Sequence, residues 1–423
     1  PGFSVSGDGS LRATTTLDEV TVDGAVDFGV REVAQFSEVL SGVGDLSGEL
    51  GFEIRQAAGD TRVTRLEVTL AGVAPVMKAR LLQGIEFARD TEELRVAEPL
   101  KPVIECELLG LPLSWLQPQI APWVVNARPI EGNLVGMVTP QGIRMMTLSP
   151  LRIEGAALAD GGTAYVDDID IEIDLGSEFT NEGWQVELGR LEMMTATGTL
   201  LNLQARAGRL QRDGDVVKVV GKLEANLAAM GEWPGLSAIA ALQQGILHAE
   251  FGLGMEDRLS VATAVTLRDL VGPTGQVLPE VSLDGRMDWK ANGSLELHLP
   301  IEISAGKQTS EMTFNFRAQP DQEGWQVEGS LVGRRVHAED LQALGDLMNR
   351  PETITAWNAH RGADVNGYSL VKSSPRQPLW HGIQGSFQTA ISEVILADSP
   401  GLSRLQGKVL IEPERVVLES FTV

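Results

Sequence analysis

Strict alternation of apolar and polar residues is the strongest pattern along this chain. The stretch Ala164–Leu175, AYVDDIDIEIDL, carries aliphatic residues at every second position from Ile169 and acidic residues between them. The stretch Ser294–Ser304, SLELHLPIEIS, repeats the pattern with Glu296 and Glu302 at polar positions. Because side chains point to alternate faces of a strand, each stretch predicts a β-strand with one apolar and one polar face.

Turn signals separate these stretches at short intervals. Asp23-Gly24, Asp213-Gly214 and Asn292-Gly293 are dipeptides typical of two-residue hairpin turns. Long continuous apolar runs, which mark parallel sheets covered on both faces, are rare. The sequence therefore predicts strands that pair antiparallel with their neighbours along the chain.

One hexamer, EGWQVE, occurs twice, at Glu182–Glu187 and at Glu323–Glu328. Each copy follows an alternating stretch and a polar loop, so each is predicted to be the return strand of an antiparallel hairpin. Trp184 and Trp325 then share the apolar face with the valine two positions later. They either pack across the strands or contact a ligand on that face, and packing is the favoured interpretation.

Helical patterns are few and short. The four best are Val30–Leu40, Pro112–Trp123, Pro234–Gly245 and Val336–Met348, and each precedes a return to strand. They divide the chain into four expected β segments at residues 1–110, 111–230, 231–335 and 336–423, the last of them truncated at its end. The last three segments begin with a helix.

The fold and the function both depend on what covers the apolar face of the sheet. In a chain of 423 residues of which 43% are hydrophobic, these helices are too few to cover the sheet. We therefore expect a mainly β fold: an elongated, twisted and curled antiparallel sheet that forms a groove, with a few short helices. The candidate groove residues are the apolar members of the alternating stretches: Leu66, Val68, Leu70, Ile169, Ile171, Ile173, Leu175, Val186, Leu295, Leu297, Leu299, Ile301, Ile303, Met312, Phe314, Phe316 and Val327.

Composition restricts what such a groove would bind. Aromatic residues make up only 5% of the chain, and the expected lining is aliphatic, which suits acyl chains better than sugars. The formal net charge of −24 disfavours nucleic acid and anionic headgroups as partners. Cys106 is the only cysteine, so an intrachain disulfide is excluded, and the chain fits either the cytoplasm or the periplasm. Both ends lie in strand-like sequence, so we expect an internal fragment of a longer protein.

No motif of catalysis or metal binding stands out. The five histidines lack zinc-site spacing, and neither a P-loop, a GxGxxG pattern nor a GxSxG elbow is present. The acidic positions of DDIDIEID suggest calcium, but their place on one strand face favours a solvated surface. Asn358, His360 and Asp364 lie close together in sequence, and a polar loop is the favoured interpretation. We therefore expect no enzymatic activity, no cofactor and no metal.

Several segments resemble the AsmA-like family, whose relatives include TamB- and YdbH-type envelope proteins of diderm bacteria. They share a Leu-rich short helix followed by glycine and an alternating strand: Gly44–Ile54, Leu108–Met145, Val336–Met348 and Trp380–Phe421. The resemblance implies an inner-membrane anchor outside this fragment, a periplasmic β-groove, phospholipid or another acyl lipid as ligand, and an outer-membrane partner. It also implies phospholipid transfer between the two membranes or support of outer-membrane assembly.

Two other functional classes remain open. The first is a structural or adhesive β-array whose apolar face is closed into a dry core. The second is a polysaccharide-active β-rich enzyme, which would need converging carboxylates in an aromatic cleft.

Overall fold

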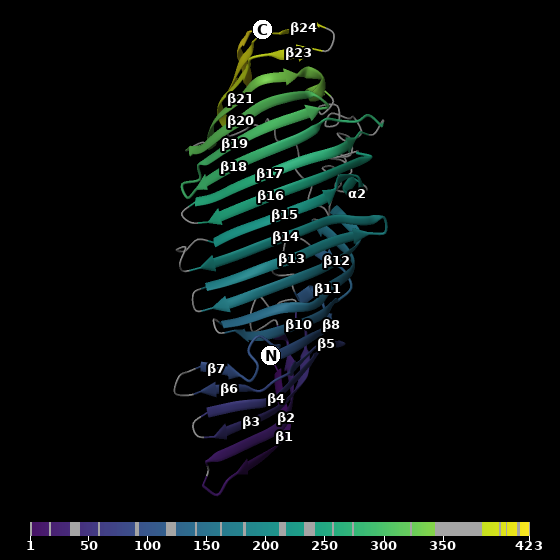
Figure 1. Ribbon diagram of the computed structural model, residues 1–423, viewed down its shortest axis with the longest axis vertical. Helices are drawn as coiled ribbons and strands as arrows, with labels where there is room; N and C mark the ends of the chain where they lie inside the picture. Colours follow the sequence, from purple (N-terminus) through teal and green to yellow (C-terminus); the bar gives the residue numbers. More distant parts are fainter. Residues whose placement is uncertain are drawn as a thin grey trace. The chain divides into compact units, whose positions relative to one another are not determined.

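The structure is a computed structural model in which strands dominate (Figure 1). It describes residues 2–422 except 17, 34–42, 58–59, 89–92, 116–123, 140–141, 161–162, 181–182, 211–216, 232–241, 256–257, 273–274, 322–323, 343–382, 397–398, 403 and 413–414. The chain divides into two units near residue 200, with most of β14 in the second. The expected mainly β fold is confirmed. The four-segment division stays a prediction.

Unit 1 is one antiparallel sheet in which most strands pair with the next strand along the chain. Its strands are β1 (Gly2–Ala13), β2 (Glu19–Arg31), β3 (Leu46–Ala57), β4 (Asp60–Ala71), β5 (Pro75–Leu81), β6 (Ile85–Ala88), β7 (Glu93–Val96), β8 (Ile104–Leu111), β9 (Val124–Asn126), β10 (Ile130–Thr139), β11 (Gly142–Asp160), β12 (Thr163–Thr180) and β13 (Gly183–Thr195). The sheet branches at β4, which pairs with β5 near its end and with β6 near its start. The main path continues through β8, β10, β11, β12 and β13.

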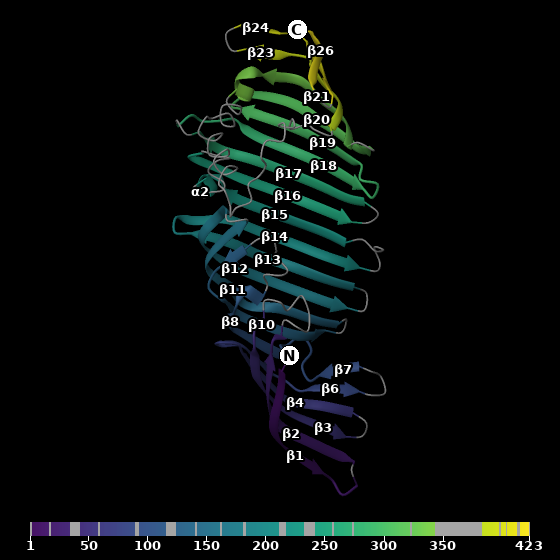
Figure 2. The ribbon, with the colours of Figure 1, turned by 180° about the vertical axis from the view of Figure 1, so that it is seen from behind.

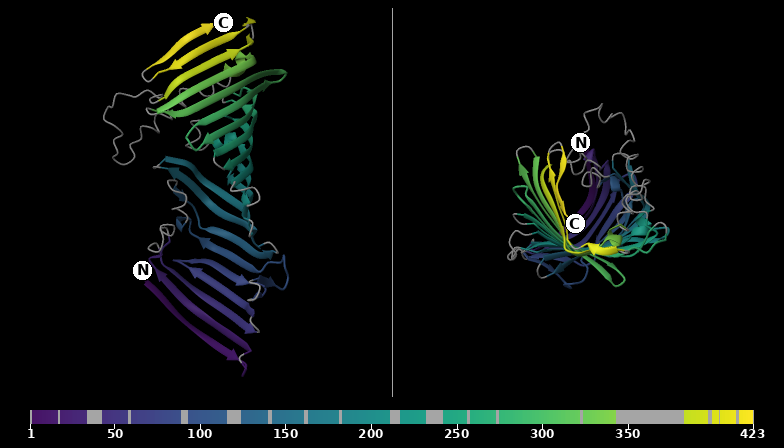
Figure 3. Two further views of the ribbon diagram at one scale, coloured as in Figure 1. Left: turned by 90° about the vertical axis from the view of Figure 1, so that its left-hand side faces the viewer. Right: turned by 90° about the horizontal axis from the view of Figure 1, so that it is seen from above.

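Unit 2 is built in the same way. Its strands are β14 (Gly198–Leu210), β15 (Val217–Asn226), β16 (Gln244–Met255), β17 (Arg258–Val271), β18 (Glu280–Lys290), β19 (Leu295–Ala305), β20 (Gln308–Asp321), β21 (Gly324–His337), β22 (Ile383–Ile391), β23 (Val394–Leu396), β24 (Ser399–Leu402), β25 (Leu405–Ile411) and β26 (Val416–Thr422). Neighbours from β14 to β21 pair antiparallel. Figures 2 and 3 show the strands of each unit as one twisted, curled layer.

One pairing departs from the expected antiparallel order. β22 runs parallel to β21, and β23 runs parallel to the last residues of β21. Parallel neighbours need a crossover of a dozen or more residues, and the chain between His337 and Ile383 is longer than that. Beyond β22 the antiparallel order resumes through β25 and β26.

The expected helices are shorter than predicted where the structure describes them. Val30 and Arg31 end β2, because their register with Phe3 and Gly2 continues the sheet. Of Pro112–Trp123, only Leu113–Trp115 is described as helical, a 3-10 turn labelled η3.

Of the other two helical predictions, one is displaced along the chain and one holds for part of its length. Near Pro234–Gly245, the described helix is α2 at Leu227–Gly231, whose first turn is capped by Asn226, and Gln244–Gly245 open β16. Val336 and His337 complete β21, and helix occupies residues 338–342. Of the other predicted positions, Glu32, Pro112, Leu242 and Gln243 are described and not helical, and Val33 is in a 3-10 turn. The remaining positions lie outside the described residues.

Both copies of the repeated hexamer open the second strand of an antiparallel hairpin, as predicted. Trp184 is the second residue of β13 and pairs with Phe179 of β12. Trp325 is the second residue of β21 and pairs with Pro320 of β20. The predicted equivalence of the two tryptophans is confirmed.

The clearest buried core lies in unit 2, where β21 gives way to residues 338–342. Its cluster consists of Val281, Ile303, Met312, Val336, Ile391 and Val394. These residues come from strand ends that meet the parallel pair β21–β22. The core therefore closes one end of the apolar face rather than its whole length.

Candidate functional site

Cross-strand register in unit 2 assembles one extended apolar face. Val261, Met287 and Leu297 lie in one row across β17, β18 and β19, and the row continues to Phe316 on β20. We call this surface the unit 2 face. Its members at alternating positions include Leu203, Leu223, Phe251, Leu253, Val261, Val265, Leu283, Met287, Leu297, Leu299, Ile301, Phe314, Phe316, Leu331 and Phe387.

The opposite side of the same strands is polar and ion-paired. Lys222 Nζ lies 2.7 Å from Glu250 Oε1, and Lys290 Nζ lies 3.1 Å from Glu296 Oε1. Hydrogen bonding to these lysines lowers the pKa of both carboxyl groups below their usual value. Shallow hollows of about 520 and 550 Å³ on unit 2 have many polar lining residues from this side, including His298. The polar side therefore offers little to an acyl chain.

Accessibility changes along the unit 2 face. At the core end, the Ile303 side chain is only 2% exposed. At the opposite end β16 turns into β17 and β20 turns into β21, and we call this the hairpin end. There Met255 is 54% exposed, Trp289 48% and Trp325 39%. Between these ends most of the lining is half-buried, and the neighbouring Ala318 and Val327 are buried. Large apolar side chains are therefore accessible to a ligand at the hairpin end of this face.

The predicted groove residues of unit 2 fall into a half-buried group and a buried group. Leu295, Leu297, Leu299, Ile301, Phe314 and Phe316 are half-buried and share the unit 2 face. Ile303 and Met312 belong to the buried cluster, and Val327 is also buried. These three are covered by protein in this structure.

Unit 1 carries a comparable apolar face. Leu50, Val68 and Ala79 lie in one row across β3, β4 and β5, and the row continues through Cys106 to Leu134. Leu66, Val68 and Leu70 are half-buried and alternate with exposed residues, as predicted. Burial raises the pKa of the Cys106 thiol.

The β11–β13 part of the unit 1 face is graded in the same way. Ile169 is buried beside Ala156, whereas Ile171, Ile173 and Leu175 are half-buried. Toward the hairpin end the side chains of Ile143, Met145, Phe179 and Val186 are exposed, Phe179 by 51%. Trp184 is half-buried next to them.

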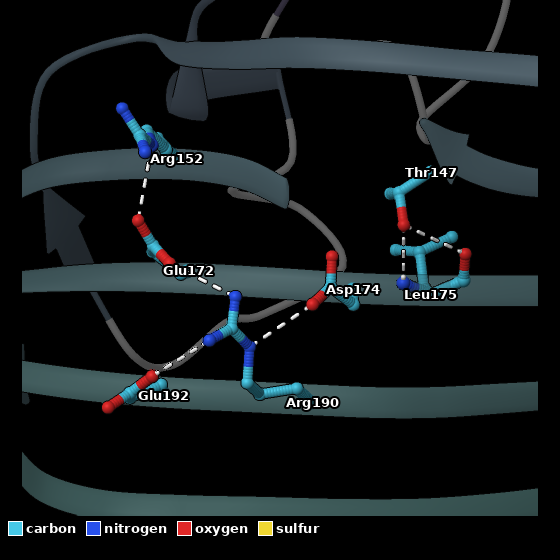
Figure 4. Close-up of polar contacts among 7 residues, drawn as sticks. All are labelled: Thr147, Arg152, Glu172, Asp174, Leu175, Arg190 and Glu192. Atoms are coloured by element: carbon cyan, nitrogen blue, oxygen red, sulfur yellow. Dashed lines mark hydrogen bonds and ion pairs between the residues drawn. The ribbon is translucent and has the colours of Figure 1, made fainter. Parts of the chain in front are cut away.

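The acidic side of β12 forms an ion-pair network with two arginines (Figure 4). Arg190 lies 3.1 Å from Asp174 and 3.2 Å from both Glu172 and Glu192, and Arg152 approaches Glu172 to 3.2 Å. The expected solvated face is thus partly shielded and charge-compensated. Sequence reasoning missed Arg190, although its place on the return strand after an acidic strand could have indicated the pairing.

A β-bulge in β13 interrupts the strand pairing within this network. Asp174 pairs with Arg190 but Leu175 pairs with Leu188, so β13 carries one extra residue. On the other side of β12, the Thr147 hydroxyl accepts a bond from the Leu175 N–H at 3.2 Å (Figure 4). These contacts hold β12 between its neighbours where the ladder is irregular.

In the part of the chain that the structure describes, no group of three or more His, Cys, Asp or Glu residues is placed to hold a metal ion. None of the described helices is long and apolar enough to cross a bilayer. The polar stretch Asn358–Asp364 lies outside the described residues.

Comparison of this chain with protein families, curated proteins and solved structures gives no match.

Proposed function

We propose that this chain is a non-enzymatic lipid-binding protein whose apolar sheet faces hold acyl chains. The observation that carries the proposal is the long, half-buried aliphatic face of unit 2, which ends in the exposed side chains of Met255, Trp289 and Trp325. A ligand with a flexible aliphatic surface would complete the burial that the short helices do not supply.

The energetics suit retention of a lipid. Burial of each methylene contributes about 0.8 kcal/mol, so a chain of roughly 16 carbons gains on the order of 10 kcal/mol on an aliphatic surface. The surface is also repetitive, because leucine, isoleucine and valine recur on strand after strand. A chain that slides along it exchanges similar contacts, and such a flat profile favours conduction.

The cellular role follows from the resemblance to AsmA-like proteins. We propose a periplasmic conduit that transfers phospholipid between inner and outer membranes or serves outer-membrane assembly. The parent protein would be anchored in the inner membrane, with an outer-membrane partner. The aliphatic lining supports this role through its fit to acyl chains.

The two rival functions gain less support. A closed structural β-array would bury the hairpin end of the apolar face, where Met255 and Trp289 are exposed. A polysaccharide-active enzyme would gather carboxylates around an aromatic cleft, whereas Glu172, Asp174 and Glu192 surround Arg190 on the polar side.

Native mass spectrometry of the purified chain tests the proposal. We expect co-purified phospholipid, released by collisional activation, with a mass distribution that follows the lipids of the expression host. The delipidated chain should take up phosphatidylcholine from detergent. A chain that carries no lipid and takes up none would refute lipid binding and favour the structural array.

A further inference from the structure

Glycines recur on both apolar faces beneath large side chains of the next strand. Gly24 pairs with Phe52, and Phe28 pairs with Gly48. In unit 2, Gly221 pairs with Phe251 and Gly329 pairs with Phe387. The four phenylalanines are half-buried, so each still presents part of its ring to the accessible side.

In each pair the ring occupies the space that a side chain at the glycine would need. A methyl group at Gly48 would come within 2.5 Å of the Phe28 Cζ atom, and one at Gly24 within 3.2 Å of the Phe52 Cζ atom, with a backbone oxygen slightly nearer in each case. Methyl groups at Gly221 and Gly329 would overlap the rings of Phe251 and Phe387. The rings therefore lie down against the backbone of the neighbouring strand rather than standing away from the sheet.

Gly329 is the clearest of these positions. The three atoms nearest to its missing side chain all belong to the Phe387 ring, and no backbone atom lies among them. Phe314 limits sideways movement of that ring, because the two ring centres are 6.0 Å apart. A methyl group at Gly329 would thus force the Phe387 ring away from the sheet, toward the side on which a ligand would lie.

Gly285 follows the same rule with an aliphatic neighbour. A methyl group there would meet the Leu299 Cδ1 atom at 3.0 Å and the Thr263 Cγ2 atom at 3.2 Å. Leu299 is one of the half-buried residues of the unit 2 face. Glycine at position 285 thus allows the Leu299 side chain to pack close to the backbone of the neighbouring strand.

We propose that five glycines, which we call the floor glycines, determine how well a ligand fits the apolar faces: Gly24, Gly48, Gly221, Gly285 and Gly329. Each allows a large neighbouring side chain to pack flat against the backbone, so that this side chain does not project into the space of the ligand. This inference rests on the proposed lipid-binding function and assigns specificity to residues that make no direct contact with lipid. A raised ring or side chain obstructs an acyl chain lying across the strands.

The test measures binding of pyrene-labelled palmitic acid to the full chain by fluorescence titration. Gly329→Ala is expected to weaken binding roughly tenfold, which corresponds to about 1.4 kcal/mol and to lost contact with about two methylene groups. Gly329→Ala/Phe387→Leu should restore the affinity to within about twofold, because the shorter side chain no longer has to rise. A purely structural role for Gly329 predicts the reverse, since the second substitution would add damage.

Gly252→Ala is the matched control. Gly252 lies on the polar side of β16, next to Phe251, and no atom lies within 4 Å of its missing side chain. This variant should bind as the wild type does. Circular dichroism and urea unfolding of every variant separate loss of binding from loss of fold.

Gly285→Ala keeps the test decisive if Gly329→Ala fails to fold. Its nearest contacts are side-chain atoms that can shift, so the fold should persist while binding weakens about threefold. Wild-type affinity in a folded Gly329→Ala or Gly285→Ala variant, or a double variant that fails to recover, would overturn the inference. Wild-type protein that binds no palmitic acid derivative would instead refute the proposed function itself.

Discussion

A carboxylate at Leu297 tests whether the unit 2 face meets a ligand or a dry core. Leu297 is half-buried and lies between Met287 and Phe316 on neighbouring strands. In the lipid-free protein, an aspartate at this position stays partly hydrated. We therefore expect Leu297→Asp to fold, with a cost of about 1–2 kcal/mol for the lost apolar burial.

Bound lipid changes that balance. An acyl chain over position 297 removes the remaining water from the carboxylate, and the effective desolvation cost of an ion in a protein is several kcal/mol. Because the site is half-buried before lipid arrives, we assign about 3 kcal/mol to this step. The affinity for an acyl chain at that position should then fall roughly a hundredfold.

The assay compares Leu297→Asp with Glu296→Gln, its neighbour on the polar side. Phosphatidylcholine uptake is followed by native mass spectrometry, and folding by circular dichroism and urea unfolding. Glu296→Gln weakens only the exposed contacts with Lys290 and Arg317 and should bind as the wild type does. Ile171→Asp in unit 1, with Asp170→Asn as its control, repeats the test on the other face.

Two results would refute this reasoning. If Leu297→Asp unfolds the protein outright, the face is a closed core and the structural array is the better interpretation. If the variant folds and binds lipid with wild-type affinity, acyl chains do not pass over β19.

Three further predictions concern single side chains. Alkylation of Cys106 by a maleimide should slow at least tenfold when lipid is bound, because the half-buried thiol lies on the unit 1 face; equal rates with and without lipid would place the ligand elsewhere. Ser310→Ala should lower the free energy of unfolding, measured in urea, by about 2 kcal/mol. The reason is that the fully buried Ser310 hydroxyl accepts a hydrogen bond from the His337 N–H at 2.8 Å and donates one to Asp340 at 3.2 Å. Ser330→Ala, on the polar side, should lower the free energy of unfolding by less. Lys222 lowers the pKa of the Glu250 carboxyl, so the stabilising contribution of this group is present above the unfolded pKa. It is lost as the pH falls through the folded pKa, which lies below 4.5. Glu250→Gln should flatten the pH dependence of the urea midpoint in that range, and an unchanged profile would contradict the pairing.

The strands and their faces could be predicted because their signal is local. Alternation at Ile169–Leu175 and Leu295–Ile303 needs only neighbouring residues to indicate a strand and its apolar side. The two EGWQVE copies could be placed for the same reason, since a short polar loop before Trp184 or Trp325 allows only a tight return.

Features set by distant residues could not be predicted from the alternation. Whether Ile303 is covered depends on Val336 and Val394, which come from a parallel pair and a short strand far along the chain. The helical pattern at Val30–Leu40 overlooked the pairing of Val30 with Phe3 and Leu46, which extends β2. The floor glycines could not be recognised before the cross-strand register placed a ring, or at Gly285 the Leu299 side chain, over each of them.

The order of pairing also has a consequence for how the chain folds. Most strands pair with the strand that comes next in sequence, so most contacts close short loops and each new hairpin can add to the one before it. The parallel pair β21–β22 breaks this series, because the pairing of Ile383 with Trp325 closes a much longer loop. Folding that proceeds strand by strand during synthesis would pause after β21, with the edge of that strand open until β22 arrives. That interval is the stage at which a nascent chain of this protein is most exposed to wrong strand pairing.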